Sequence, residues 1–436
     1  RRIDRMRDFD IVVVGGGLAG LCAASFAASG GGRVALFESS PDLGGRARTR
    51  IKEGFYFNYG AHALYRGGAL DTALRDQGVV PGAKVPNLAA GYFVRDRTLH
   101  LAPFSASGLA ETTLYPSALK AEVGAALARF AKSAPEVAPG VSVRKAVEEF
   151  SQSPHVRELL SAMLRLTSLV HDPDAADGAT LFAQLHRALS TPVVYVDDGW
   201  NQLVSALAAR ADSGGCLLGV GRRVTAIEPG KMWRVETSNG NSVSAPAVVV
   251  ALPPRDALAL LPYAETLRVA ADRSVAVYAA CLDLGLSQLP EPRHNFALGL
   301  DEPLYLSVHS AAARLAPEGG ALVHILRYLQ PDQQLDKTLL LAELEGFADL
   351  VQPGWRSYVR ASQFFWKMPV TYSEPLARYR GHAGRPEVAV PGFSGLYIAG
   401  DWVGSHSLLS DAAAASGRLA GELAAGFAQK NRSSSA

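Results

Sequence analysis

The hydrophobic and polar positions of the first forty residues predict a strand, a helix and a second strand. Phe9 to Val14 is a short, mainly apolar run typical of a buried strand, and Arg33 to Glu38 is another. Between them, Leu18 to Ala28 predicts a helix that carries small residues on its sheet-facing side. The chain therefore opens with a strand, helix, strand unit of an α/β fold.

A glycine-rich turn joins the first strand to the helix and predicts a dinucleotide site. Gly15, Gly17 and Gly20 match the pattern GxGxxG, in which each glycine has its own task. The first permits a tight turn, the second lets the backbone approach a pyrophosphate, and the third lets the helix pack on the strand. Because the helix N-terminus faces the anion, Leu18 and Ala19 are also expected cofactor contacts.

Two features after the second strand narrow the choice of nucleotide. Glu38 stands at the spacing of a carboxylate that accepts both ribose hydroxyls, which disfavours the 2'-phosphate of NADP. A second turn, DLGGRARTR, follows directly. In it Gly44 and Gly45 let the backbone pass near phosphates, while Arg46 and Arg48 neutralise the diphosphate. NAD sites do not need this second turn, so it favours FAD.

Two later regions have patterns that fit the same domain. Gly199 to Ala211 predicts a helix, and Val220 to Glu228 predicts a strand with a turn at Gly221, followed by a meander. Near the end of the chain, 396–399 predicts a buried strand, and a long alanine-rich helix is expected over 410–427. Ser410 or Asp411 is the expected cap of that helix.

The remaining residues predict a second domain with a different sheet. Six segments alternate or run apolar like strands of a mixed or antiparallel sheet, namely 91–94, 97–101, 274–284, 303–310, 321–329 and 356–365. Helical spacing at Ser117 to Lys132 and Pro154 to Val170 predicts helices that roof a pocket between the domains.

Composition and charge exclude several classes of protein. A chain of 436 residues predicts two or three domains, and a net charge of +2 gives no basic field for nucleic acid. Cys22, Cys216 and Cys281 are too widely spaced for a metal site or a disulfide set, so we expect packing residues in a reducing, cytoplasmic compartment. No apolar run reaches the roughly eighteen residues of a transmembrane helix. The apolar region 106–130 leaves room for peripheral membrane contact, and core packing explains it equally well.

Three motifs in this order resemble those of the flavin-dependent amine oxidase superfamily, which includes amine oxidases, protoporphyrinogen oxidase and phytoene desaturase-like enzymes. VVVGGGLAGL with LGGRARTR is similar to its N-terminal signature, and GWNQLVSALAARA with GRRVTAIE to its central one. GLYIAGDWVGSHSLLSDAAAASGRLAGELA is similar to its C-terminal signature. The resemblance implies a Rossmann-like FAD-binding domain of the GR2 type, interleaved with an α+β substrate domain.

The resemblance also implies roles for particular residues around a noncovalent FAD. The backbone of Val224 would hold the adenine edge, and Asp401, after Gly400, would bond a hydroxyl or phosphate of the flavin chain. The segment NYGAHALY would bring Gly60 and Ala61 beside the flavin ring. The helix start would face the ring at Ser410, Asp411 and Ala412. A positive helix end there would stabilise the reduced, anionic flavin.

The same comparison divides the chain into discontinuous domains. The FAD-binding domain would comprise residues 1–90, 199–262 and 376–428, and the substrate domain would comprise 91–198 and 263–375. We expect the polar lead-in RRIDRMRD and the segment 429–436 to lie outside the fold, the latter as a flexible tail.

Candidates for the chemistry lie beside the implied flavin ring. The expected reaction is removal of a hydride from a substrate carbon in a buried pocket, with His62 and then His406 as candidate bases. A turn hydrogen bond is the alternative role for His62. The expected pocket residues are Tyr65, Trp366, Tyr372 and Trp402, and core packing is the alternative for the aromatic side chains.

Two absences favour the desaturase-like branch, whose substrates are apolar or polycyclic. The chain has no lysine between Lys231 and Lys337, where many amine oxidases carry one, and no cysteine shortly before GLYIAGD for a covalent flavin link. Three alternatives stay open: a flavin amine oxidase, a redox-neutral isomerase and a non-enzymatic escort protein. Intact phosphate, ribose and GD positions argue against the last. The expected partners are a small-molecule substrate and an electron acceptor such as oxygen or a quinone.

Overall fold

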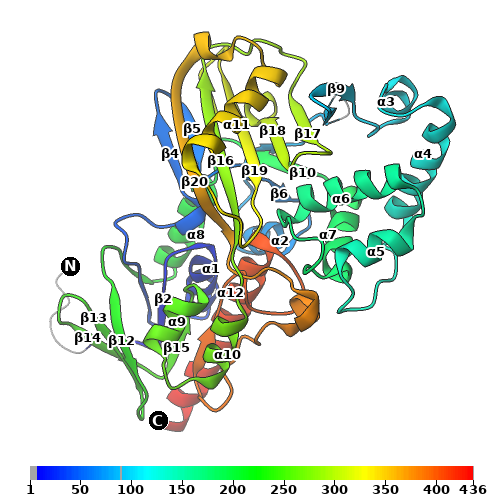
Figure 1. Ribbon diagram of the computed structural model, residues 1–436. Helices are drawn as coiled ribbons and strands as arrows, with labels where there is room; N and C mark the ends of the chain where they lie inside the picture. Colours follow the sequence, from blue (N-terminus) through cyan, green and yellow to red (C-terminus); the bar gives the residue numbers. More distant parts are fainter. Residues whose placement is uncertain (1–6, 89–90, 436) are drawn as a thin grey trace.

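A five-stranded parallel sheet forms the centre of the lower body in Figure 1. The computed structural model describes residues 7–88 and 91–435, and the sheet has the order β11-β3-β2-β15-β21. Its strands are β2 (Ile11–Val14), β3 (Val34–Phe37), β11 (Leu217–Gly219), β15 (Ala247–Val250) and β21 (Leu396–Ile398). Val13 lies opposite both Leu36 and Val249, so three distant segments of the chain meet in one register. The predicted α/β class and its opening strand, helix, strand unit are confirmed.

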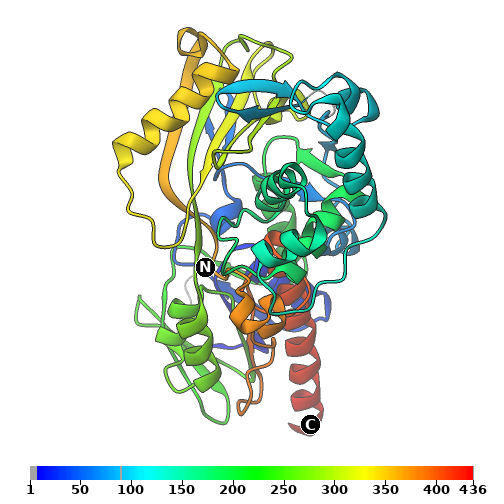
Figure 2. The ribbon, with the colours of Figure 1, turned by 45° about the vertical axis from the view of Figure 1, so that its right-hand side comes forward.

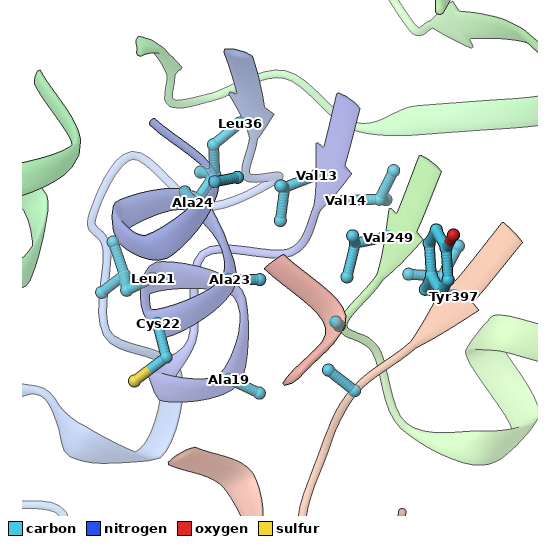
Figure 3. Packing of buried hydrophobic residues seen from close by; sticks show 14 of the residues in the cluster. Val13, Val14, Ala19, Leu21, Cys22, Ala23, Ala24, Leu36, Val249 and Tyr397 are labelled. Carbon is cyan, nitrogen blue, oxygen red and sulfur yellow. The ribbon is translucent and has the colours of Figure 1, made fainter. Parts of the chain in front are cut away.

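Small residues let two helices approach each other closely over this sheet. Helix α1 (Leu18–Ser29) and helix α12 (Leu409–Ser435) pack together, with Gly417 and Gly421 against the backbone of α1. A Cβ on Gly417 would lie 2.2 Å from the carbonyl oxygen of Ala19, so no larger residue fits there. Figure 3 shows α1 side chains and strand residues such as Val13 and Val249 in one apolar cluster.

Smaller sheets and helices pack around the parallel sheet, and they include α10, which was expected in the substrate domain but contributes Leu267 to the same apolar cluster. The meander forms a four-stranded sheet in the order β1-β14-β13-β12, and the 199–211 helix is α8. The predicted strand 220–228 begins later, because the Gly221 turn separates β11 of the parallel sheet from β12. The bounds are β1 Arg7–Asp8, β4 Thr49–Lys52, β5 Phe55–Asn58, β12 Val224–Glu228, β13 Trp233–Thr237, β14 Ser242–Ala245, η1 Gly45–Ala47, α2 Ala69–Asp76, α8 Asn201–Ser213, α9 Pro254–Leu260 and α10 Glu265–Arg273.

The predicted mixed or antiparallel sheet is a seven-stranded sheet in the order β20-β16-β19-β18-β17-β8-β9. All neighbours are antiparallel except β17 and β8, which run parallel. The bounds are β8 Tyr92–Arg95, β9 Thr98–Leu101, β16 Val277–Leu286, β17 Phe296–Gly299, β18 Leu304–Val308, β19 Ala321–Tyr328 and β20 Val359–Thr371. A small sheet, β6-β10-β7 (Leu64–Tyr65, Val193–Val196 and Ala83–Lys84), lies at the junction with the cofactor domain.

Each face of the large sheet has its own helical cover. Ala279 and Leu326 belong to the cluster of α3 to α7, whereas Ala280 and Ile325 belong to the cluster of α11, as the alternation of side chains along a strand requires. Figure 2 shows α11 on one side of the large sheet and the helices α3 to α7 on the opposite side. The bounds are α3 Ala106–Glu111, α4 Ser117–Lys132, α5 Val143–Phe150, α6 Pro154–Ser168, α7 Gly178–Ser190 and α11 Lys337–Val351.

The large apolar side chains of the region 106–130 are buried or half-buried, whereas most of its alanines are exposed. Val123 and Phe130 of α4 are fully buried, and Phe130 lies 5.2 Å from Phe182 between ring centroids. Among the described residues, no helix combines the length and apolar character needed to cross a membrane.

The two ends of the chain differ from expectation. Of the lead-in, residues 1–6 lie outside the described residues, whereas the backbone of Arg7 and Asp8 pairs with β14. Helix α12 continues through Ser435, where a flexible tail over 429–436 was expected. Arg432 lies 3.2 Å from the buried carboxylate of Asp10, and Gln429 donates to the Gly30 carbonyl, so tertiary contacts extend this helix.

Candidate functional site

The first glycine turn combines tight packing with one open face. A Cβ on Gly20 would lie 1.8 Å from the carbonyl oxygen of Gly15, and one on Gly15, at φ +104°, would lie 2.5 Å from that of Ala251. Gly17 differs, since a Cβ there meets no atom within 4 Å. Two of the glycines thus serve the fold, and the Gly17 face is free for a ligand to approach the backbone.

The second glycine turn lies directly against the first. The Gly44 N–H donates to the Gly16 carbonyl at 2.7 Å, and a Cβ on Gly45 would be 3.4 Å from the Gly17 Cα. Both Gly44 and Gly45 have positive φ, which glycine adopts without strain. Arg48 donates from Nε to the Gly45 carbonyl and holds the turn. The two motifs therefore form a single backbone surface.

Glu38 stands beside this surface with its carboxylate held by backbone donors. Its Oε2 accepts from the Gly16 N–H and its Oε1 from the Ser40 N–H, both at 2.7 Å. The Ser39 hydroxyl also donates to Oε1 at 3.2 Å, so Oε2 keeps a lone pair for a ribose hydroxyl, and Oε1 can accept a second one when the exposed Ser39 hydroxyl turns away. This geometry suits the predicted ribose contact.

We expect Glu38→Ala to weaken FAD binding by about 1.5–3 kcal/mol per hydrogen bond lost to the ribose, or about 10- to 100-fold for one bond. Quenching of FAD fluorescence by the apoprotein measures the dissociation constant. Glu38→Gln is the matched control, because its amide keeps one acceptor oxygen and should lose less. Equal affinity for wild type and Glu38→Ala would remove Glu38 from the site.

A partly buried ion pair lies where the C-terminal motif meets the second turn. Arg46 Nη2 is 2.8 Å from Asp401 Oδ2, and its Nη1 donates to the Val370 carbonyl. The guanidinium also lies 4.7 Å from the ring centroid of Tyr372, whose N–H donates to Asp401. Asp401 is 2% exposed, yet its Oδ1 has no partner. A buried carboxylate oxygen without a donor is costly and fits a hydroxyl of a bound cofactor chain.

These residues fit a flavin dinucleotide. The open face of Gly17 suits a diphosphate, Glu38 a ribose, and the unpartnered Oδ1 of Asp401 a hydroxyl donor. Val224 is buried at the start of β12, beside a register shift, and its adenine contact stays a prediction.

The segment predicted to lie beside the flavin ring packs onto β16 and β20. A Cβ on Gly60, at φ +83°, would meet Met368, and Cys281 Sγ lies next at 3.7 Å. His62 Nδ1 contacts the Gly60 carbonyl at 2.9 Å and must donate to it, which leaves Nε2 as the acceptor. Burial lowers the pKa of His62 to about 4, so the ring is neutral at pH 7. The turn hydrogen bond expected as an alternative is therefore present, and the role as a base stays a prediction.

Asp411 does not cap its own helix. Its Oδ1 accepts from the N–H of Leu70 in the first turn of α2, and its Oδ2 lies 3.3 Å from Arg187 Nη1. Helix α12 begins at Leu409, and Asp411 joins α2 and α7 to that start. The contacts of Ser410 and Ala412 with the flavin ring stay predictions.

The four predicted pocket aromatics lie in different surroundings. Tyr372 stands beside Arg46, and Trp402 is 2% exposed with its indole donating to the Leu252 carbonyl. Tyr65 donates to the carbonyl of Thr167 on α6, and burial raises its pKa to about 12. Trp366 is 43% exposed, so core packing is wrong for this residue.

His406 is exposed, and its Nε2 lies 3.3 Å from the hydroxyl of its neighbour Ser405. His62 stacks edge-on against Trp200 instead, at 4.6 Å between ring centroids. The described contacts do not bring the two candidate bases together.

Trp402 also borders a cavity of about 310 Å³ between α10 and the 373–386 segment. Glu374 lines this cavity, is 4% exposed, and has no hydrogen-bond partner at either carboxylate oxygen. Burial raises its pKa to about 8. Nothing in the sequence distinguishes this glutamate from a surface one.

We expect Glu374→Gln to raise the free energy of unfolding at pH 9 and to leave it nearly unchanged at pH 4. A carboxyl whose folded pKa is raised stabilises below its unfolded value near 4.5, and this contribution is lost as the pH rises through about 8. The gain should be a few kcal/mol, measured by urea unfolding at both pH values. Glu318→Gln on the exposed surface is the control, and an equal change in both variants would contradict the prediction.

The large sheet contains a polar cluster that was not predicted from the sequence. Asp283 and His324 are fully buried in strands that are otherwise apolar, and Cys281, expected only to pack, donates to Asp283. The signal was available, because an acid in YAACLDLGL and a histidine in ALVHILRY interrupt buried runs. The sulfur of Cys281, an oxygen of Asp283 and a nitrogen of His324 lie within 4.8 Å of one another.

Comparison with known proteins gives a family and a fold. The profile of the family described as "Flavin containing amine oxidoreductase" matches residues 18–282. A "Carotenoid 3,4-desaturase" from Haloarcula japonica is 47% identical over 51 residues, which is 12% of this chain and 10% of the relative. The local match thus spans about a tenth of that relative's length.

Two solved structures share the fold along nearly the whole chain. A mutant of putrescine oxidase has a TM-score of 0.76 at 14% identity, covering 98% of this chain and 100% of its own. Cyclohexylamine oxidase from Brevibacterium oxydans IH-35A has a TM-score of 0.70 at 15% identity, with the same coverage. At these identities the likeness shows the fold alone.

Proposed function

The chain belongs to the family of flavin containing amine oxidoreductases, and on that premise we propose that it is an FAD-dependent enzyme that removes a hydride from a carbon of an apolar or polycyclic small molecule. The observation that carries the proposal is the buried, unpartnered Oδ1 of Asp401, beside Arg46 and the two joined glycine turns. An escort protein without a cofactor would have no use for this group.

The residues of this chain divide the work of holding the cofactor. The Gly17 face receives the diphosphate, Glu38 the ribose, and Asp401, fixed by Arg46, a hydroxyl of the flavin chain. When bound, the flavin supplies a hydride acceptor at N5. The Asn58 to Tyr65 segment, which packs onto β16 and β20, would align the substrate carbon beside it.

The proposed substrate class rests on what stands at the lysine position of amine oxidases. Strand β16 carries no lysine, and Lys367 on β20 lies over the ring of Tyr278 at 4.7 Å instead. A local identity to a carotenoid desaturase agrees with an apolar substrate, and an equally local identity to an L-amino-acid oxidase from Echis ocellatus, 51% over 53 residues, agrees with an amine. A flavin amine oxidase is the second candidate, favoured by the match to the family of flavin containing amine oxidoreductases.

We also propose how the flavin is held, which molecules accept its electrons and in which compartment the protein works. The flavin is held noncovalently, and the electrons pass from it to oxygen, a quinone or another small acceptor. The three cysteines are buried and free, which suits the reducing cytoplasm.

An absorption spectrum of the purified protein, reconstituted with FAD, tests the cofactor first. We expect an oxidised flavin spectrum and complete release of the flavin by acid, and a protein that takes up no FAD would overturn the proposal. Anaerobic mixing with polyenes, porphyrinogens and amines then tests the donor. Bleaching by a polyene or porphyrinogen supports the proposal, and bleaching by amines alone supports the second candidate.

A further inference from the structure

A set of buried polar groups lies inside the large sheet, and we call it the Asp283 network. Asp283 and Cys281 are on β16, His324 is on β19, and Gln363 is on β20. The side chains of Asp283 and His324 have no exposed surface. Burying a carboxyl and an imidazole away from water is unfavourable unless both are paired, so their pairing needs an account.

Asp283 is fully hydrogen-bonded, whereas His324 is not. Asp283 Oδ1 lies 2.5 Å from His324 Nδ1 and accepts from Cys281 Sγ at 3.1 Å, while its Oδ2 accepts from Gln363 Nε2 at 2.6 Å. The Asp283 carboxylate thus fixes the tautomer of His324 with its proton on Nδ1. The Nε2 atom of His324 is buried and has no partner.

This unpartnered nitrogen belongs to a group of histidines. The ring of His309 lies 4.4 Å from that of His324 and stacks on Tyr195 at 3.7 Å, and His309 Nδ1 is also unpartnered. A charge on His324 lowers the pKa of His62, whereas the charge of Asp283 raises it. Three titratable groups contact His324 or act on it through their charge, namely Asp283, His309 and His62. Cys281 contacts Asp283, and Tyr195 and Tyr305 contact His309.

The Asp283 network touches the segment expected beside the flavin ring. Gln363 Nε2 donates both to Asp283 and to the Asn58 carbonyl, the latter at 2.7 Å. Gly60 faces Cys281, and Tyr59 packs on Phe365 at 4.4 Å between centroids. A change of charge at the flavin site therefore acts on His324 through a low-dielectric interior, where electrostatic effects are strong.

We propose that the Asp283–His324 dyad takes up the proton that accompanies reduction of the cofactor, with His324 Nε2 as the accepting atom. The inference rests on the proposed function. The flavin, when bound, would accept one substrate hydrogen together with its bonding electron pair. The electron pair of a neighbouring C–H or N–H bond would form the new double bond, and the proton released from that bond would be taken up at His324 Nε2.

Asp283 is a positioning residue in this step. As in other carboxylate and imidazole pairs, it holds the tautomer and stabilises the imidazolium that forms. The low pKa of His62 makes that ring a poor place for the proton to stay. A metal ion could compete for Cys281, Asp283 and His324. In this structure Asp283 Oδ1 instead accepts hydrogen bonds from the Cys281 thiol and from His324 Nδ1–H.

The pH dependence of the flavin midpoint potential tests the proposal without any substrate. Spectroelectrochemical titration of wild type near pH 7 should give a slope about twice that of His324→Asn, because one additional proton enters per electron pair. Asn keeps a donor near the Nδ1 position and removes the Nε2 acceptor. His294→Asn is the matched control, since the His294 ring contacts the Val351 carbonyl and the Tyr92 ring and makes no contact with the Asp283 network among the described residues, and it should keep the wild-type slope.

Equal slopes in wild type and His324→Asn would overturn the dyad while leaving the flavin assignment intact. A protein that binds no flavin would overturn the proposed function and the dyad together. If His324→Asn fails to fold, ¹⁵N-histidine NMR of wild type decides. One buried imidazole should become doubly protonated on reduction, and unchanged histidine signals would refute the proposal. Metal analysis of the purified protein adds a further test, because a stoichiometric divalent ion lost in His324→Asn would replace the dyad by a metal site.

Discussion

Gly17→Val is expected to abolish flavin retention while leaving the protein folded. Gly17 has an ordinary extended backbone at φ −74°, and a Cβ there meets no protein atom within 4 Å. The valine Cβ would therefore clash with nothing in the apoprotein, and the φ of Gly17 is one that valine readily adopts. They would instead occupy the face through which a diphosphate must approach the backbone N–H groups. Flavin content of the purified variant, measured from its absorption after FAD incubation, should fall to background.

Two other glycine variants give this result its meaning. Gly346→Ala in α11 also adds a Cβ into open space but lies far along the chain from the glycine turns, so it should retain flavin fully. Gly20→Ala would place a Cβ 1.8 Å from the Gly15 carbonyl oxygen and should lower the melting temperature as well as the flavin content. Normal flavin content in Gly17→Val would refute the dinucleotide assignment.

The sequence predicts the cofactor half of the molecule well because its signals are local. Gly15, Gly17, Gly20 and Glu38 lie within one strand, helix, strand unit, so spacing alone places them on one edge of the sheet. The strands of the large sheet were also predicted, except β17, since alternation and apolar runs need no partner to be visible.

The rest of the site depends on contacts between distant segments, which no local pattern specifies. Asp411 was expected to cap its own helix, but its carboxylate accepts from Leu70, 341 residues away in the chain. The pairing of Asp283 with His324 depends on the register of β16 against β19. The carboxyl of Glu374 is buried by an arrangement of α10 and the 373–386 segment that its own neighbours do not predict.

Asp401→Ala is the second variant with a large expected effect, because it removes two interactions. One is the ion pair with Arg46 within the protein, and the other is the proposed hydrogen bond to the bound cofactor. The apoprotein loses the partner of Arg46, whose guanidinium is about one-third exposed and so is screened in part by water. The loaded protein also loses the acceptor for the flavin chain. A hydrogen bond to a charged group contributes about 1.5–3 kcal/mol, so FAD affinity should fall roughly 10- to 100-fold from this contact alone.

A double-mutant cycle separates the two losses. Arg46→Ala and Asp401→Ala, alone and combined, should show a coupling free energy in apoprotein unfolding of about 1 kcal/mol, since the pair is partly exposed. Asp401→Asn is the conservative control, because its side-chain oxygen still accepts from the Tyr372 N–H and its volume is kept, while the charge is removed and an amide donor replaces the Oδ1 acceptor. If Oδ1 faces the cofactor as its lack of a partner indicates, Asp401→Ala must weaken FAD binding even in the Arg46→Ala background. Loss of affinity only when Arg46 is present would show that Asp401 acts by positioning the arginine and does not itself bind the cofactor.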